Sequence, residues 1–126
     1  MTANKNYQLG LLYLVHLLIN ADGVIDEKER QALVRVTAAE GIPESTFLAF
    51  EAEIANKKER EIYLDGIEMI NSCTRDEKLT ALAHLYKMSE ADGHVHVKEV
   101  RLLLYSIRQA GIEFDEVVQL AKRKTY

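Results

Sequence analysis

The stretch NADGVIDEKE at residues 20–29 returns seventy positions later as EADGHVHVKE at residues 90–99. Each copy carries an Asp-Gly pair and a Glu six residues after the Gly. The same shift aligns Leu9 with Leu79, Leu12 with Leu82, Leu33 with Leu103, and the Gly-Ile pair at 41–42 with the pair at 111–112. A chance match would not keep one register over about forty positions. The sequence therefore predicts an internal duplication.

Each copy has the apolar spacing of three helices, predicted at 7–20, 27–40 and 43–55, and again at 76–90, 97–110 and 115–124. Thr74 and Glu77 have capping-box spacing at the start of the helix at 76–90. Gly41 and Gly111 suit the left-handed position that follows a helix. A seventh helix, predicted at 59–73, links the copies through an apolar stripe that includes Ile62, Ile67 and Ile70.

These segments predict an all-α fold of about seven helices in a single domain, 1–126. Repeat one spans about 7–56, the linker helix about 59–73 and repeat two about 76–125. The helices at 7–20 and 76–90 are apolar on nearly every face, so they should lie buried at the centre. The two halves should then pack about a near-twofold axis.

Composition narrows the class of protein. The chain has 126 residues, 48% of them hydrophobic and 29% charged, which is ordinary for a globular domain. A net charge of -4 argues against a general nucleic-acid binder, because phosphate contacts need a basic face. The single cysteine, Cys73, excludes an intrachain disulfide and fits a reducing compartment. The apolar run Leu9–Ile19 is shorter than the ~20 residues that span a bilayer, so we expect a cytoplasmic protein without membrane insertion.

The repeated turn has a purely structural interpretation. Asp26 and Glu29 have the spacing of a capping pair at the start of the helix at 27–40, and Gly23 suits a positive φ. The second copy fits less well, because His96 stands at the capping position and histidine is a poor N-cap. Glu99 is nevertheless kept, so a role other than capping is also open.

The second interpretation compares the turn with the calcium loop of an EF-hand. Asp22, Gly23, Asp26 and Glu29 fall at positions 5, 6, 9 and 12 of that loop, as do Asp92, Gly93, His96 and Glu99 in the second copy. Position 1, where calcium expects a carboxylate, is Leu18 or Met88. The candidate metal ligands are Asp22, Asp26, Glu29, Asp92, His96 and Glu99. Without position 1 they predict weak binding of Ca²⁺ or Mg²⁺, with Zn²⁺ less favoured.

Histidines offer a further alternative at the second turn. His94 and His96 lie beside Asp92 and Glu99, a set of side chains that could hold a transition metal if the turn folds their tips together. His16 and His84 fall within the predicted central helices, which favours buried histidines bonded to backbone or carboxylate. A third Asp-Gly pair, at Asp65 and Gly66, lacks the following Glu and is interpreted as a glycine tolerated inside a helix.

A buried helix, then ADG, an apolar residue two positions later, a Glu six positions after the Gly and a helix ending in GI together resemble the TerB family. That family includes tellurite-resistance proteins and the amino-terminal domain of DjlA-type co-chaperones. The resemblance covers nearly the whole chain and implies a duplicated helical fold with acidic turns. It further implies proposed cation binding and a role in stress-response or membrane-associated assemblies. The matching residues are Asp22, Glu29, Asp92 and Glu99. The chain lacks the His-Pro-Asp segment of a J-domain, so co-chaperone activity does not follow.

The functional expectation is a non-catalytic interaction module with protein partners. The alternatives are a small metal-dependent hydrolase and a pseudo-EF-hand calcium sensor. Against an enzyme, the sequence has no nucleophile elbow, Gly-rich phosphate loop or HExxH motif. Its acidic residues are also divided between two similar turns rather than differentiated into an acid and a base.

Overall fold

The computed structural model describes residues 5–19, 27–91 and 112–123. These residues form six helices and no strand, which confirms the all-α class for the described part. In chain order the helices are α1 (Lys5–Ile19), α2 (Glu27–Glu40), α3 (Glu44–Ile54), α4 (Glu59–Asn71), α5 (Arg75–Ala91) and α7 (Phe114–Lys122). The further helix expected at 97–110 lies outside the described residues.

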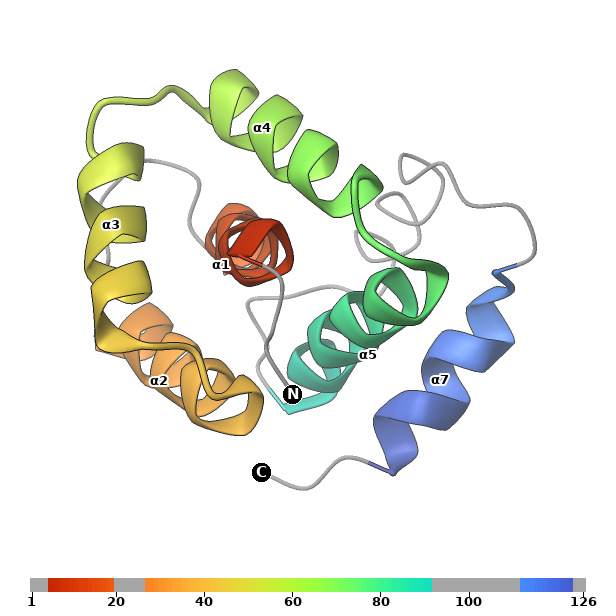
Figure 1. Cartoon of the computed structure of the whole chain (residues 1–126). Coiled ribbons are helices and arrows are strands. Elements are labelled where there is room, and N and C mark those ends of the chain that lie inside the picture. Colours follow the sequence, from red (N-terminus) through yellow and green to blue (C-terminus); the bar gives the residue numbers. More distant parts are fainter. Residues whose placement is uncertain (1–4, 20–26, 92–111, 124–126) are drawn as a thin grey trace.

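Helix α1 is the centre of the fold, with α2, α3, α4 and α5 arranged around it and α7 on the far side of α5 (Figure 1). Side chains on every face of α1 are buried, including Leu11, Leu12, Tyr13, Leu14 and Val15, each 0% exposed. This burial follows from a sequence that is apolar all round the helix. The prediction of a buried central helix at 7–20 is therefore confirmed over residues 7–17, for which burial is described.

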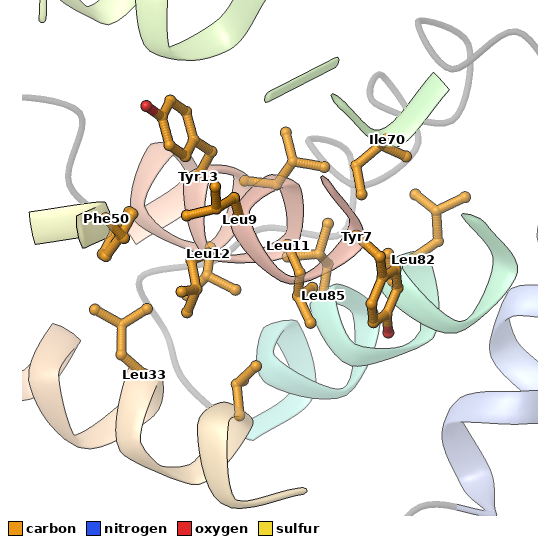
Figure 2. Packing of buried hydrophobic residues seen from close by; sticks show 14 of the residues in the cluster. Tyr7, Leu9, Leu11, Leu12, Tyr13, Leu33, Phe50, Ile70, Leu82 and Leu85 are labelled. Carbon is orange, nitrogen blue, oxygen red and sulfur yellow. The ribbon is translucent and has the colours of Figure 1, made fainter. Parts of the chain in front are cut away.

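The surrounding helices each bury one stripe. Residues four apart lie on one face of a helix, and the buried positions follow that spacing: Thr46, Phe50 and Ile54 in α3, Ile62, Gly66 and Ile70 in α4, and Val117 and Ala121 in α7. The larger apolar side chains among them (Phe50, Ile54, Ile62, Ile70 and Val117) belong to one core with those of α1 and α5. Figure 2 shows Phe50 and Ile70 beside α1. Helix α5 is less enclosed than we expected. Its residues 81–85 are buried, whereas Thr80, Tyr86 and Lys87 are partly exposed.

The start of α5 and the end of α2 are each determined by a few neighbouring residues. Glu77 and Thr74 form the predicted capping box, with the Thr74 N–H donating to the Glu77 carboxylate and the Glu77 N–H to Thr74 Oγ1. Gly41 has a φ of 64°, and Ile42 N–H donates to the Thr37 carbonyl while Gly41 N–H donates to that of Ala38. That pair of bonds is a Schellman end, which explains why the helix stops at a Gly-Ile pair.

The linker helix proves to be the main neighbour of α1. α4 makes the most extensive contact with α1 of any helix, and two glycines allow it. A Cβ on Gly10 would stand 2.9 Å from Ile70 Cδ1, and a Cβ on Gly66 would stand 3.1 Å from Tyr13 Cβ. Gly66 is thus more than a tolerated glycine, because any larger residue there would press on α1.

α5 and α7 form the second large helix contact. Two pairs of side chains join these helices. Arg75 Nη2 donates to both carboxylate oxygens of Glu116, at 2.8 and 2.9 Å. The rings of Tyr86 and Phe114 meet edge to face, with centroids 5.6 Å apart.

The bounds of the described helices agree with the predicted duplication. A shift of seventy residues carries α1 onto α5 and α3 onto α7 to within two residues at each end. The near-twofold packing of complete halves stays a prediction, because the counterpart of α2 lies outside the described residues.

Candidate functional site

The predicted metal ligands fall at the two repeated turns. Asp22, Asp26, Asp92, His96 and Glu99 lie outside the described residues. Glu29 lies in the first turn of α2, and its side chain is likewise outside the described part. The expected capping pair of Asp26 and Glu29, and the alternative site at His94 and His96, therefore remain predictions. The described ranges contain no group of three or more His, Cys, Asp or Glu side chains arranged to hold a metal.

The described structure includes both flanks of the first turn and the helix that precedes the second. The first turn lies between Ile19, which ends α1, and Glu27, which begins α2; the second follows Ala91, which ends α5. Helices α1 and α5 are the two elements predicted to be central. The first turn therefore continues directly from α1, and the second continues directly from α5.

A buried polar cluster connects three helices near the other end of α1. The Tyr7 hydroxyl donates to Glu40 Oε2 over 2.9 Å, and His84 Nε2 lies within hydrogen-bonding distance of the same oxygen. Tyr7 and His84 are 4% and 1% exposed, whereas the Glu40 side chain that accepts from both is 18% exposed. The expectation that His84 is a core histidine satisfied by a carboxylate is confirmed. His16 is also buried, with its ring edge-on to Phe50.

The electrostatics of this cluster favour a structural role. Burial, followed by the nearby Glu40 carboxylate, raises the pKa of the Tyr7 phenol far above its usual range. Tyr7 therefore stays a hydrogen-bond donor at physiological pH and cannot serve as a base. A carboxylate that accepts from donors on α1 and α5 holds the end of α2 against both helices.

A second cluster lies at the other side of α1, beside the α3–α4 connection. The Tyr13 hydroxyl donates to Glu53 Oε1 over 2.6 Å, and Lys57 pairs with Asp65 while its Nζ stands 5.5 Å from the Tyr13 ring centroid. Burial and the hydrogen bond to Glu53 raise the pKa of Tyr13 to about 12. The hydrogen bond with Asp65 raises the pKa of Lys57, so its amine stays charged rather than nucleophilic.

The single cysteine belongs to the hydrophobic core. Cys73 is buried, and its Sγ lies 3.4 Å from the Met69 carbonyl oxygen. Burial and the neighbouring Glu77 raise the pKa of the thiol. Since the thiolate is the reactive form, this environment suppresses nucleophilic chemistry.

The outward face of α2 carries a shallow hollow of about 560 Å³. Among the described residues, its lining comes from one helix: Glu27, Arg30, Gln31, Val34 and Arg35. Sequence reasoning did not single out these residues. The repeated apolar character of Val34 and its counterpart Leu104 was a weak signal, because apolar repetition more often indicates a core position.

The clusters around Tyr7 and Tyr13 were also missed. Glu40 and His84 are 44 residues apart, and Tyr13 and Glu53 are 40 apart, so no spacing rule links them. The sequence indicated only that a tyrosine in an apolar helix needs a hydrogen-bond partner for its hydroxyl group.

Within the described ranges, no helix combines the length and the apolar character that crossing a bilayer requires.

Comparison with known proteins identifies the family of this chain. A family model described as "Tellurite resistance protein TerB" matches residues 8–122. Neither the curated proteins nor the solved structures contain a match to this chain. The matched span includes all six described helices except the first three residues of α1, together with both Asp-Gly turns. The chain therefore belongs to the TerB family.

Proposed function

We propose that this chain is a non-catalytic interaction module of the TerB type that binds divalent cations weakly at its two acidic turns. The observation that carries the proposal is the family match over residues 8–122, which includes both turns in one continuous span. The module would act in stress-response or membrane-associated assemblies, as membership of a tellurite-resistance family suggests.

The described polar groups support a module without catalysis. The carboxylates of Glu40 and Glu53 accept hydrogen bonds from the tyrosines of α1, and Glu116 pairs with Arg75. These groups join one helix to another, which is a structural role. The raised pKa values of Tyr7, Tyr13 and Cys73 keep each of them protonated and hence unsuited to act as base or nucleophile.

The composition of the turns supports weak cation binding. The first turn offers Asp22, Asp26 and Glu29, and the second offers Asp92 and Glu99 with His96. Calcium takes six to eight oxygen ligands, and Leu18 and Met88 supply none at position 1. The affinity should therefore be of the millimolar class, with Ca²⁺ or Mg²⁺ preferred to Zn²⁺.

Calorimetry on chelator-stripped protein tests this proposal. We expect weak binding of Ca²⁺ or Mg²⁺ that falls in Asp22→Asn/Glu29→Gln, with the fold retained. A matched control is Glu68→Gln/Asp76→Asn, which removes the same charges from exposed positions of α4 and α5. Equal losses in the two variants would mean that general electrostatic attraction, rather than the turn, holds the cation. Submicromolar affinity for calcium would contradict our interpretation of Leu18 and Met88.

The interaction part has its own test. The wild-type chain should capture a defined set of proteins from its native cell, and Asp22→Asn/Glu29→Gln should lose those that need the first turn. A chain that retains no protein above background, with or without added calcium, would contradict the module.

A further inference from the structure

An ion pair between α2 and α3 lies beside the first acidic turn. Arg30 is the fourth residue of α2 and directly follows Glu29, one of the candidate ligands. Its Nη2 donates to Glu51 Oε2 of α3 over 2.9 Å. The two side chains are 47% and 25% exposed, so water reaches both of them. An exposed ion pair contributes little to folding stability, so either residue can be changed without loss of the fold.

The sequence carries this pair in the first copy of the repeat and not in the second. The shift of seventy residues places Val100 at the position of Arg30 and Ala121 at that of Glu51. Ala121 is 0% exposed in α7, so the counterpart of Glu51 is a core position. The arginine and the glutamate are therefore present together in one copy and replaced together in the other, as expected of two residues that act as a unit.

An arginine at this position works against a cation in the first turn. The guanidinium group is always charged, and it repels a divalent ion. Asp26, a candidate ligand, lies four positions before Arg30 in the chain, the spacing at which opposite charges pair on a helix surface. An Arg30 without Glu51 would therefore repel the cation and also compete with it for a carboxylate.

Glu51 offsets both effects. Its carboxylate gives the guanidinium group a hydrogen-bond partner on α3, outside the turn, and its charge balances that of Arg30. The core holds α3 in place next to Glu51, because Phe50 is 0% exposed and Phe47, one helical turn earlier, packs against the same core. The balancing charge is thus carried by a helix that is anchored independently of the turn.

We propose that Glu51 is a positioning residue for the first turn: by holding Arg30 against α3, it keeps the affinity of that turn for a divalent cation above that of a turn beside a free arginine. The inference rests on the proposed cation binding and adds how one of the two sites is regulated. A residue of α3 that is not a ligand sets the affinity of the first turn, whereas the second turn, with Val100 and Ala121, lacks this control.

A site-resolved calcium titration of the full chain tests this role. Amide resonances of ¹⁵N-labelled, chelator-stripped protein report on residues 20–29 and 90–99 separately, so the second turn is an internal control. Glu51→Gln keeps the shape of the side chain and removes its charge. We expect the dissociation constant of the first turn for Ca²⁺ to rise about threefold at low ionic strength and less as salt is added, with the second turn unchanged.

A double-mutant cycle tests whether Glu51 acts through Arg30. Arg30→Gln removes the repelling charge and should tighten Ca²⁺ binding at the first turn by about threefold. Arg30→Gln/Glu51→Gln leaves the net charge unchanged and should bind within about twofold of wild type. Thermal melts in chelator check that each variant is folded.

Glu116→Gln is the matched control, because it also frees an arginine, Arg75, from an ion pair. Arg75 lies between Cys73 and Glu77, which are both close enough to Tyr7 for their charges to raise its pKa. Tyr7 is about 18 Å along α1 from the end of that helix, where the first turn begins. Glu116→Gln should therefore leave the affinity of the first turn unchanged.

Three results would overturn the role of Glu51. The first is an unchanged first turn in Glu51→Gln, and the second is an equal weakening in Glu51→Gln and Glu116→Gln, which would indicate general electrostatic attraction. The third is a double variant as weak as Glu51→Gln, which would mean that Glu51 acts on the cation without Arg30.

Failure of the proposed function is recognised separately in the same titration. If the wild-type chain binds Ca²⁺ at both turns and Glu51→Gln binds it equally well, the cation sites stand and the role of Glu51 is wrong. If the wild-type chain shows no change at either turn with Ca²⁺ or Mg²⁺, the cation sites are wrong and the role of Glu51 fails with them.

Discussion

The α1–α4 pair and the α5–α7 pair are the two largest helix contacts of the described structure, and they are built in opposite ways. α1 and α4 approach so closely that glycines at positions 10 and 66 face the partner helix. α5 and α7 are joined instead by the partly exposed ion pair of Arg75 with Glu116 and by the edge-to-face rings of Tyr86 and Phe114. The first contact depends on two glycines that leave room for the partner helix, whereas the second includes an ion pair and an aromatic pair. Substitutions should therefore have effects of different size on the two pairs.

The largest expected effect is the loss of Ile70 from the close contact. Ile70 is 0% exposed, and its side chain fills the space left by Gly10. Ile70→Ala should lower the free energy of unfolding by about 2–5 kcal/mol in urea denaturation, because it removes buried carbons and leaves a cavity. Val117→Ala, which removes fewer carbons from the α5–α7 contact, is the matched comparison. A greater loss for Val117→Ala would mean that the second contact holds the fold.

The next effect comes from adding an atom to the close contact. In Gly10→Ala the new Cβ would meet Ile70 Cδ1 and Cγ1 at 2.9 Å. Overpacking costs about 1–3 kcal/mol, and the better helix propensity of alanine returns about 1 kcal/mol, so a net loss is expected.

A double-mutant cycle gives the control for that effect. Ile70→Val shortens the side chain that the new Cβ meets, so Gly10→Ala/Ile70→Val should be more stable than the sum of the two single losses predicts. Strict additivity would show that the two positions do not press on each other.

A smaller effect is expected at Tyr13, whose Cβ faces Gly66 of α4 and whose hydroxyl bonds Glu53 of α3. Tyr13→Phe removes the hydrogen bond to Glu53 and should cost about 1 kcal/mol at neutral pH. The folded-state pKa of Tyr13 is raised to about 12, so between pH 10 and 12 the unfolded chain releases a proton that the folded chain keeps. Stability therefore falls as pH rises through this window, and part of that fall should vanish in Tyr13→Phe. Identical alkaline slopes in thermal melts would place the Tyr13 phenol in water.

The smallest effect is expected at the α5–α7 pair. Arg75 lowers the pKa of the Glu116 carboxyl, so their attraction stabilises the fold above the usual carboxyl range and is lost as pH falls through the lowered folded-state pKa. Glu116→Gln should lower the melting temperature slightly at pH 7, less in high salt and not at all in strong acid. A difference that persists in acid would assign the effect to the capping bond between Glu116 and the Glu113 N–H.

The features that were predictable from sequence are those determined by neighbours along the chain. The bounds of α1, the capping box of Thr74 and Glu77, and the left-handed Gly41 each follow from a few consecutive residues. The carboxylate partner expected for His84 also exists, although its identity as Glu40 could not be read from spacing.

The features that were missed depend on distances between helices. An apolar stripe shows that α4 packs against something, but not that α1 is its main neighbour. Gly66 looked like a local weakness of the helix, because only the position of Tyr13 reveals what a Cβ would meet. At the candidate metal site the described structure includes the ends of α1 and α2 beside the first turn and the end of α5 before the second, and the role of the six candidate ligands stays a prediction.

The close contact between α1 and α4 has a consequence for how the chain is made. Gly10 leaves the ribosome some sixty residues before Ile70, which covers it. At a synthesis rate of about 5–20 residues per second, the apolar surface of α1 stays without α4, its main neighbour, for roughly 3–12 s. Throughout that interval the apolar surface of α1 lacks the helix that covers it most extensively. The nascent chain should therefore be a client of ribosome-associated chaperones until α4 emerges, and slowing translation between residues 20 and 70 should increase aggregation more than slowing it later.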